Sequence, residues 1–204
     1  VEEGQVRDRP CLGVGALQEL AAWGAHTLDD RFADKVLMPG LIEGHCHLKE
    51  GSMWDLPYLG WFDRRDPQGT VWPGLRSMTS VVERLAEVDA QMRAAGRADT
   101  EPLIAWGFDP IYFGGERMTV EHLDRASARR PIVIGHANGH LMNVNSAMLK
   151  LAEITRDNEV EGVVKFPGGQ NAGEPTGELQ EPAAMFLVVR KIGVPGHEEF
   201  GIGA

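Results

Sequence analysis

The sequence is poor in cysteine and has no long apolar run. Its 204 residues include only two cysteines, Cys11 and Cys46, in unrelated contexts, so we expect no disulfide framework and a reducing cytoplasm as the default location. No apolar stretch approaches the roughly 18 residues that a membrane-spanning helix needs. The first residues show no basic region followed by an apolar core, so no signal peptide is visible. These absences predict a chain without a membrane partner.

Basic side chains are also scarce relative to acidic ones. Lysine and arginine number 20 against 30 acidic residues, which gives a formal net charge of −10 and a pI near 5.1. A nucleic-acid surface needs clustered cations for the phosphates, so this function class is excluded. The composition, 43% hydrophobic and 25% charged, is that of an ordinary globular protein. A small-molecule partner fits best, and nothing indicates the oligomeric state.

The order of apolar segments and turns predicts an α/β fold, because strand-like runs alternate with helix-like ones. The expected strands are 103–108 and 131–134, and the expected helices are 79–95, 120–126, 145–151 and 179–189. Thr79 or Ser80 is the expected cap of the first helix. Two segments lack helical periodicity and are expected to be surface loops: 48–74, with three tryptophans, and 155–177.

The segment 36–47 ends in His45-Cys46-His47, which is the strongest chemical signal in the chain. Residues i and i+2 of a strand point to the same face, so the two imidazoles would lie side by side. Neutral imidazole is a common ligand of zinc, and a catalytic site needs about three protein ligands. The alternative is that the two histidines line a strand by chance and bind no metal.

Other candidates are weaker. His136 and His140 share a loop rich in Gly and Asn, where histidines orient substrate or bond the backbone as readily as they bind metal. Glu178 and Glu181 lie three apart on the expected last helix, so they would share a face, either at a helix N-terminus or at a metal pocket. Arg129-Arg130 is expected to be a solvated turn.

Taken together, these segments resemble the amidohydrolase superfamily, specifically amidohydrolase family 3, which includes N-substituted formamide deformylases. Three blocks match in order. The first is Val36–His47, VLMPGLIEGHCH, similar to LPGxIDxHxH, with Glu43 in place of the usual Asp. The second joins Leu123–Ser127 and Arg130-Pro131 to Gly139–Leu149, similar to LDxAxxxRPV…GHxxxxNSxAL. The third is Gly173–Glu181, GEPTGELQE, similar to GEPTGxLxE.

The resemblance implies a fold and a division of the chain. The fold would combine part of a metal-dependent-hydrolase TIM barrel with the remnant of an N-terminal β-sandwich and an α/β insertion. Residues 1–35 would be the sandwich remnant, 36–51 the first barrel strand, 52–180 the insertion, and 181–204 the return to the barrel. Later barrel blocks of the family are not found in this sequence, so we expect the 204 residues alone to be inactive.

The resemblance also implies a chemistry, the hydrolysis of C–N bonds of amide or formamide type. His45 and His47 would bind a divalent metal, zinc by preference, and His140 and Glu181 would contact the substrate. The general base would be an Asp that no residue here matches. The alternative is a metal-binding or interaction fragment that has no catalytic activity.

Overall fold

The computed structural model describes residues 53–193 and isolated positions between 22 and 35. The chain divides into two compact units, Val1–His45 and Cys46–Ala204, and the fold below belongs to the second. The expected first barrel strand therefore lies outside the described residues. Among the residues that are described, no helix is long and apolar enough to cross a membrane.

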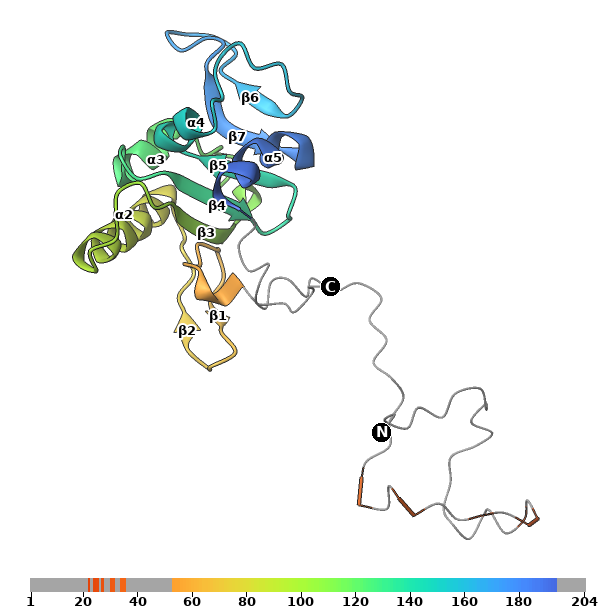
Figure 1. The fold of residues 1–204 in the computed structure, drawn as a ribbon. Coiled ribbons are helices and arrows are strands. Elements are labelled where there is room, and N and C mark those ends of the chain that lie inside the picture. The colour runs from red at the N-terminus through yellow and green to blue at the C-terminus, as the bar shows by residue number, and fades with distance from the viewer. Residues whose placement is uncertain are drawn as a thin grey trace. The chain divides into compact units, whose positions relative to one another are not determined.

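Five strands form one mixed sheet in the order β3-β4-β5-β7-β6 (Figure 1). In that order they are β3 (Leu103–Phe108), β4 (Ile132–His136), β5 (Leu141–Val144), β7 (Pro175–Gln180) and β6 (Val163–Lys165). β3 and β4 pair in parallel, whereas the other three neighbouring pairs are antiparallel. The architecture is mixed α/β, as the alternation of segments predicts.

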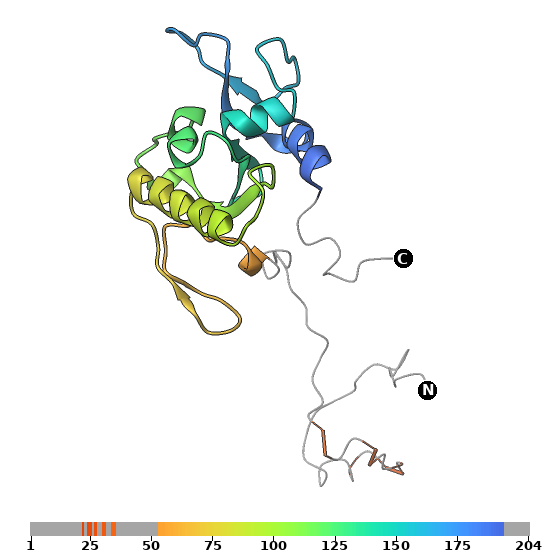
Figure 2. The same cartoon turned by 60° about the vertical axis from the view of Figure 1, so that its left-hand side comes forward.

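Helices cover both faces of this sheet (Figure 2). They are α2 (Met78–Ala94), α3 (Val120–Ala126), α4 (Ser146–Leu151) and α5 (Glu181–Ile192). Ile132 and Ile134 share a core with α2 and α3, whereas Val133 shares one with α4 and α5. Successive strand residues face opposite sides, so β4 is buried on both faces. This explains the unbroken apolar run at 132–134.

The helix starts follow local capping. Asn145 caps α4, and its side-chain oxygen accepts from the backbone nitrogen of Met148 at 3.0 Å. The cap of α2 is Ser77, so the expectation of Thr79 or Ser80 is wrong. Ser77 Oγ accepts from the nitrogen of Ser80 at 3.1 Å, and Ser80 Oγ accepts from the nitrogen of Ser77 at 3.2 Å. Ser80 therefore takes the third position of a capping box, where Glu or Gln is usual.

Arg130 is fully buried, so the expectation of a solvated turn is wrong for this residue, whereas Arg129 is exposed. Its Nε donates to Asp89 Oδ1 at 2.6 Å, and its Nη1 donates to the carbonyl oxygens of Ala98 and Glu101 at 2.6 and 2.7 Å. The guanidinium thus joins α2, the turn after it and the start of β4. A buried charge is tolerated here because a carboxylate and several carbonyls surround it.

Part of the expected loop 48–74 is a β-hairpin that extends away from the sheet (Figure 1). Its strands β1 (Arg64–Arg65) and β2 (Val71–Trp72) pair antiparallel. Asp66 closes the turn by accepting from the nitrogen of Thr70 at 2.8 Å and from Trp72 Nε1 at 3.0 Å. These bonds fix the indole ring of Trp72.

A bulge at Gly107 reorients the end of β3. Trp106 pairs with Gly135 and Phe108 with His136, so Gly107 has no counterpart in β4. Its φ is +92°, and an added Cβ would lie 2.6 Å from Tyr58 Cε2. Glycine is therefore required both by the backbone conformation and by the space. The bulge turns Phe108 into the core shared with α2 and α3, where its ring packs edge-on against His136.

Candidate functional site

Polar side chains gather where β4 and β7 end and β5 begins. β4 ends at His136, a short turn leads to His140, and β5 starts at Leu141. Leu141 pairs with Gln180, the last residue of β7, so His140 and Glu181 follow from neighbouring strand ends. Connections at strand ends are where scaffolds commonly present binding and catalytic residues.

His140 and Glu181 are joined twice, which brings together the two predicted substrate contacts. The backbone nitrogen of Glu181 donates to the carbonyl oxygen of His140 at 2.8 Å. In addition, His140 Nδ1 donates to Glu181 Oε2 at 3.0 Å. The side chains are 67% and 64% exposed. A carboxylate therefore orients the imidazole, and its Nε2 has no hydrogen-bond partner within residues 53–193. Such an imidazole can accept a proton or bind a ligand.

Glu181 adopts a backbone conformation that is unusual for its residue type. Its φ is +63°, in the left-handed region, although it is the first residue of α5. A conformation of this kind costs on the order of 1–3 kcal/mol in a residue other than glycine. The backbone bond to His140 and the start of the helix hold it in place. Strain that neighbours enforce at an exposed carboxylate is typical of functional positions.

Glu178 lies in β7 and not on a helix, so the expected common helical face with Glu181 is wrong. Its side chain is only 4% exposed and forms an ion pair with both Nε and Nη2 of Arg117, the Nε bond measuring 2.8 Å. Gln180 Nε2 donates to Glu178 Oε1 at 2.7 Å. Hydrogen bonding to Glu178 raises the pKa of Arg117.

His136 is buried next to this ion pair. Asn143 Nδ2 donates to the carbonyl oxygen of Met118 at 2.9 Å, so its Oδ1 faces His136 Nε2, which donates at 2.5 Å. His136 Nδ1 is buried, and no side chain or backbone group of residues 53–193 forms a hydrogen bond with it. Burial lowers the pKa of His136, although Asn143 and the negative charge of Glu178 oppose the shift. The ring is thus held neutral, with an unpaired acceptor at Nδ1.

The structure leaves the predicted metal ligands untested. His45 and His47 lie outside the described residues. Among the residues that are described, no group of three or more His, Cys, Asp or Glu side chains could hold a metal ion. The described part of the chain therefore does not by itself fit a metal. His140 and Glu181 have suitable donor atoms, but they bond each other.

Sequence reasoning missed Arg117, Asn143 and Gln180 as parts of the polar cluster. A signal for β7 exists in Pro175–Gln180, where Thr176, Glu178 and Gln180 alternate with less polar residues at the period of a strand. Arg117 carries no comparable signal, because its partner is 61 residues away in the sequence.

Three known proteins are similar to parts of this chain. Protein LONG AFTER FAR-RED 3 of Arabidopsis thaliana is 27% identical over 201 residues, which cover 95% of this chain and 31% of that protein. A solved structure of an uncharacterized metal-dependent hydrolase from Pyrococcus horikoshii OT3 covers 74% of this chain, with 18% identity and a TM-score of 0.46. Another, from Pyrococcus furiosus, covers 77% of this chain, with 21% identity and a TM-score of 0.45. The chain spans less than a third of each relative: 31%, 24% and 26%.

One family model matches most of the chain. It is described as the amidohydrolase family, and it matches residues 33–198. The match includes the His45/His47 segment, the turn that carries His140 and the end of β7 that carries Glu181. Its extent agrees with the three sequence blocks, which fall within the same range. On this evidence the chain belongs to the amidohydrolase family.

Proposed function

We propose that this chain contributes to a metal-dependent hydrolase that cleaves C–N bonds of amide or formamide type. The observation that carries the proposal is the His140–Glu181 pair, joined at 3.0 Å and presented at neighbouring strand ends of a member of the amidohydrolase family. Two residues 41 positions apart converge there, and one of them holds a strained backbone. A substrate amide offers both a carbonyl acceptor and an N–H donor, and this pair can serve both.

The proposed roles follow the chemistry of each side chain. Glu181 accepts a hydrogen bond from His140 and retains lone pairs for a substrate N–H. His140 Nε2 faces the substrate and donates to an oxygen when the ring is protonated, or accepts a proton when it is neutral. Because the carboxylate holds the ring, little rotamer entropy is lost on binding. The general base is assigned to no residue of this chain.

Metal binding belongs to the proposal through His45 and His47. A divalent ion, zinc in this proposal, would polarise the scissile carbonyl and lower the pKa of water toward ~7. The partial TIM barrel, the sandwich remnant, the four-part division of the chain and the cytoplasmic location are proposed with it. The partner is a small amide-type molecule and neither a membrane nor a nucleic acid.

The test is hydrolysis of N-substituted formamides by the longest gene product that carries this chain. We expect turnover that requires a divalent metal and falls at least about 100-fold in His45→Asn/His47→Asn. Glu181→Gln and His140→Asn should raise KM more than they lower kcat, since they are substrate contacts. Glu161→Gln, at an exposed carboxylate outside the three sequence blocks, is the matched surface control and should behave as wild type.

Two outcomes would contradict the proposal. The first is zinc binding without turnover of any amide or formamide, which would instead support a metal-binding or interaction module. The second is turnover that persists in the double histidine variant.

A further inference from the structure

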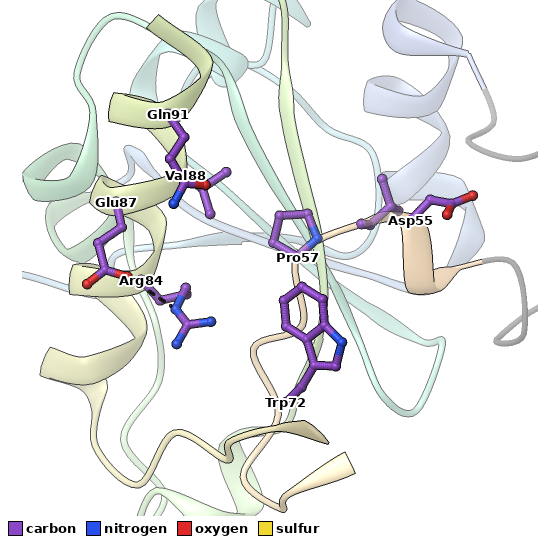
Figure 3. A pocket seen from close by; sticks show the side chains of 8 residues that line it. Asp55, Pro57, Trp72, Arg84, Glu87, Val88 and Gln91 are labelled. Atoms are coloured by element: carbon purple, nitrogen blue, oxygen red, sulfur yellow. Dashed lines mark ion pairs between the residues drawn. The ribbon is translucent and has the colours of Figure 1, made fainter. Parts of the chain in front are cut away.

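A cleft lies between α2 and the segment that precedes the sheet, and none of its lining residues belongs to the polar cluster at the strand ends. Its volume is about 290 Å³. Figure 3 shows Pro57 and Trp72 on one side and Val88 on α2 on the other, with a gap between them. This volume is close to the lower limit of roughly 300–1,000 Å³ for small-molecule pockets. The cleft therefore suits a ligand of about one ring.

The apolar walls are fixed in position before any ligand binds. Trp72 donates its Nε1 hydrogen to Asp66 Oδ2 at 3.0 Å, which holds the indole by its edge. The carbonyl oxygen of Pro57 accepts from the nitrogen of Trp106 at 3.1 Å, which ties this wall to β3. Val88 packs against the core beneath α2. A preformed cleft with an aromatic side chain in its wall favours a ligand that carries a planar ring.

Charge in the cleft is distributed unevenly. Arg84 and Glu87 form an ion pair in the lining of the cleft. The side chain of Arg84 is 26% exposed and that of Glu87 is 65% exposed. Figure 3 shows its guanidinium in the gap on the Trp72 side of α2, whereas the carboxylate of Asp55 points away from the gap. The Arg84 Nε to Glu87 Oε2 distance is 3.4 Å, and the guanidinium donates no hydrogen bond to any of residues 53–193. Its donors therefore remain available to an anion.

We propose that this cleft binds a small planar carboxylate, with the ring between Trp72 and Val88 and the carboxylate on Arg84. A guanidinium presents a fork that matches carboxylate geometry, and it would exchange a poorly aligned contact with Glu87 for a bidentate one. The chain carries a net charge of −10, so long-range attraction does not explain the binding of an anion. The site is independent of the proposed hydrolase function, and neither stands or falls with the other.

The test is a titration of the 204-residue protein with benzoate, followed by the NMR signal of the Trp72 indole N–H. Benzamide has the same ring without the charge, and benzylamine carries the opposite charge. We expect benzoate to shift the signal with a dissociation constant of about 1–10 mM, and to bind at least about fivefold more tightly than either control compound. Arg84→Gln should weaken benzoate binding about fivefold or more.

Two further variants separate the site from general surface binding. Glu87→Gln removes the competing carboxylate and should strengthen benzoate binding about twofold. Arg125→Gln removes an exposed arginine from α3 and should leave it unchanged. The proposal is overturned by an absent Trp72 shift, by equal binding of benzylamine or benzamide, or by wild-type affinity in a folded Arg84→Gln variant.

Discussion

At the scale of single residues, buried polar groups distinguish the strand ends from an ordinary core. His136 and Glu178 are both nearly inaccessible, yet each forms a side-chain hydrogen bond, His136 with Asn143 and Glu178 with Arg117. The sequence singles out His136 as a candidate but does not show that it is buried. Its burial depends on the packing of neighbouring strands, and its hydrogen-bond partner Asn143 lies on the following strand. The identity of Arg117 as the partner of Glu178 is likewise decided by tertiary packing.

The buried ring of His136 predicts acid sensitivity. Its pKa in the folded state lies below the ordinary value of 6.5, chiefly because burial penalises the charged form. As the pH falls, His136 therefore binds a proton in the unfolded chain before it does so in the folded chain. The contribution of His136 to the free energy of unfolding should be fully present above about pH 6.5. It should be lost as the pH falls toward the folded-state pKa. Urea unfolding between about pH 8 and about pH 5 measures this.

The matched variant is His136→Gln, which keeps a donor for Asn143 and cannot titrate. It should flatten the pH dependence of the unfolding free energy in this range. An unchanged slope in His136→Gln would show that other groups cause the acid sensitivity.

The buried ion pair predicts a loss of stability when only one partner is removed. Arg117→Met leaves the Glu178 carboxylate buried with Gln180 as its remaining side-chain donor. We expect the free energy of unfolding to fall by about 2–3 kcal/mol, less than the roughly 3–5 kcal/mol of a fully buried pair, because Arg117 is half exposed. Arg125→Met on α3 is the control and should cost less than about 0.5 kcal/mol.

A double-mutant cycle tests the coupling itself. Arg117→Met/Glu178→Gln should be more stable than the sum of the single effects predicts, by at least about 1 kcal/mol. Strict additivity would mean that the two side chains do not interact in solution.

At the scale of elements, the sequence predicted the helices whose caps and apolar spacing involve residues close together in the chain. The helices 120–126 and 146–151 were accessible from the sequence because Asn145 and the apolar spacing act within a few residues. The last helix begins at Glu181 and not at Leu179, because Leu179 pairs with Met142 across the sheet. The sequence did not predict the hairpin at 64–72, because strands of two residues are too short to show a pattern. Its turn is closed by the side chain of Asp66.

The bulge in β3 is an element-level feature with a direct test. Gly107→Ala introduces a Cβ 2.6 Å from Tyr58 at a φ of +92°, so strain and overlap add. We expect a cost of about 2–4 kcal/mol in the free energy of unfolding. Gly96→Ala has a φ of +75° with no atom within 4 Å and should cost only about 1 kcal/mol. Equal costs would show that the close approach to Tyr58 is unimportant.

At the scale of the whole molecule, the family match and the strand pairing both concern the same sequence blocks. Three ordered blocks identify the family from sequence, and the family model covers them in residues 33–198. The sheet then explains why two of those blocks lie side by side, since Leu141 and Gln180 are paired neighbours. The pairing depends on contacts distant in sequence, which no local pattern encodes. The proposed metal ligands, His45 and His47, are not among the described residues.

The central claim is that His45 and His47 hold a metal ion, and thermal unfolding of the 204-residue chain with zinc tests it most directly. A ligand at 100 times its dissociation constant stabilises the folded state by about 2.7 kcal/mol, so the melting temperature should rise by about 5–10 °C. His45→Asn/His47→Asn should abolish the rise, and His197→Asn, a histidine without a predicted role, should retain it. A melting temperature that zinc does not change, or a rise that persists in the double variant, would contradict the account.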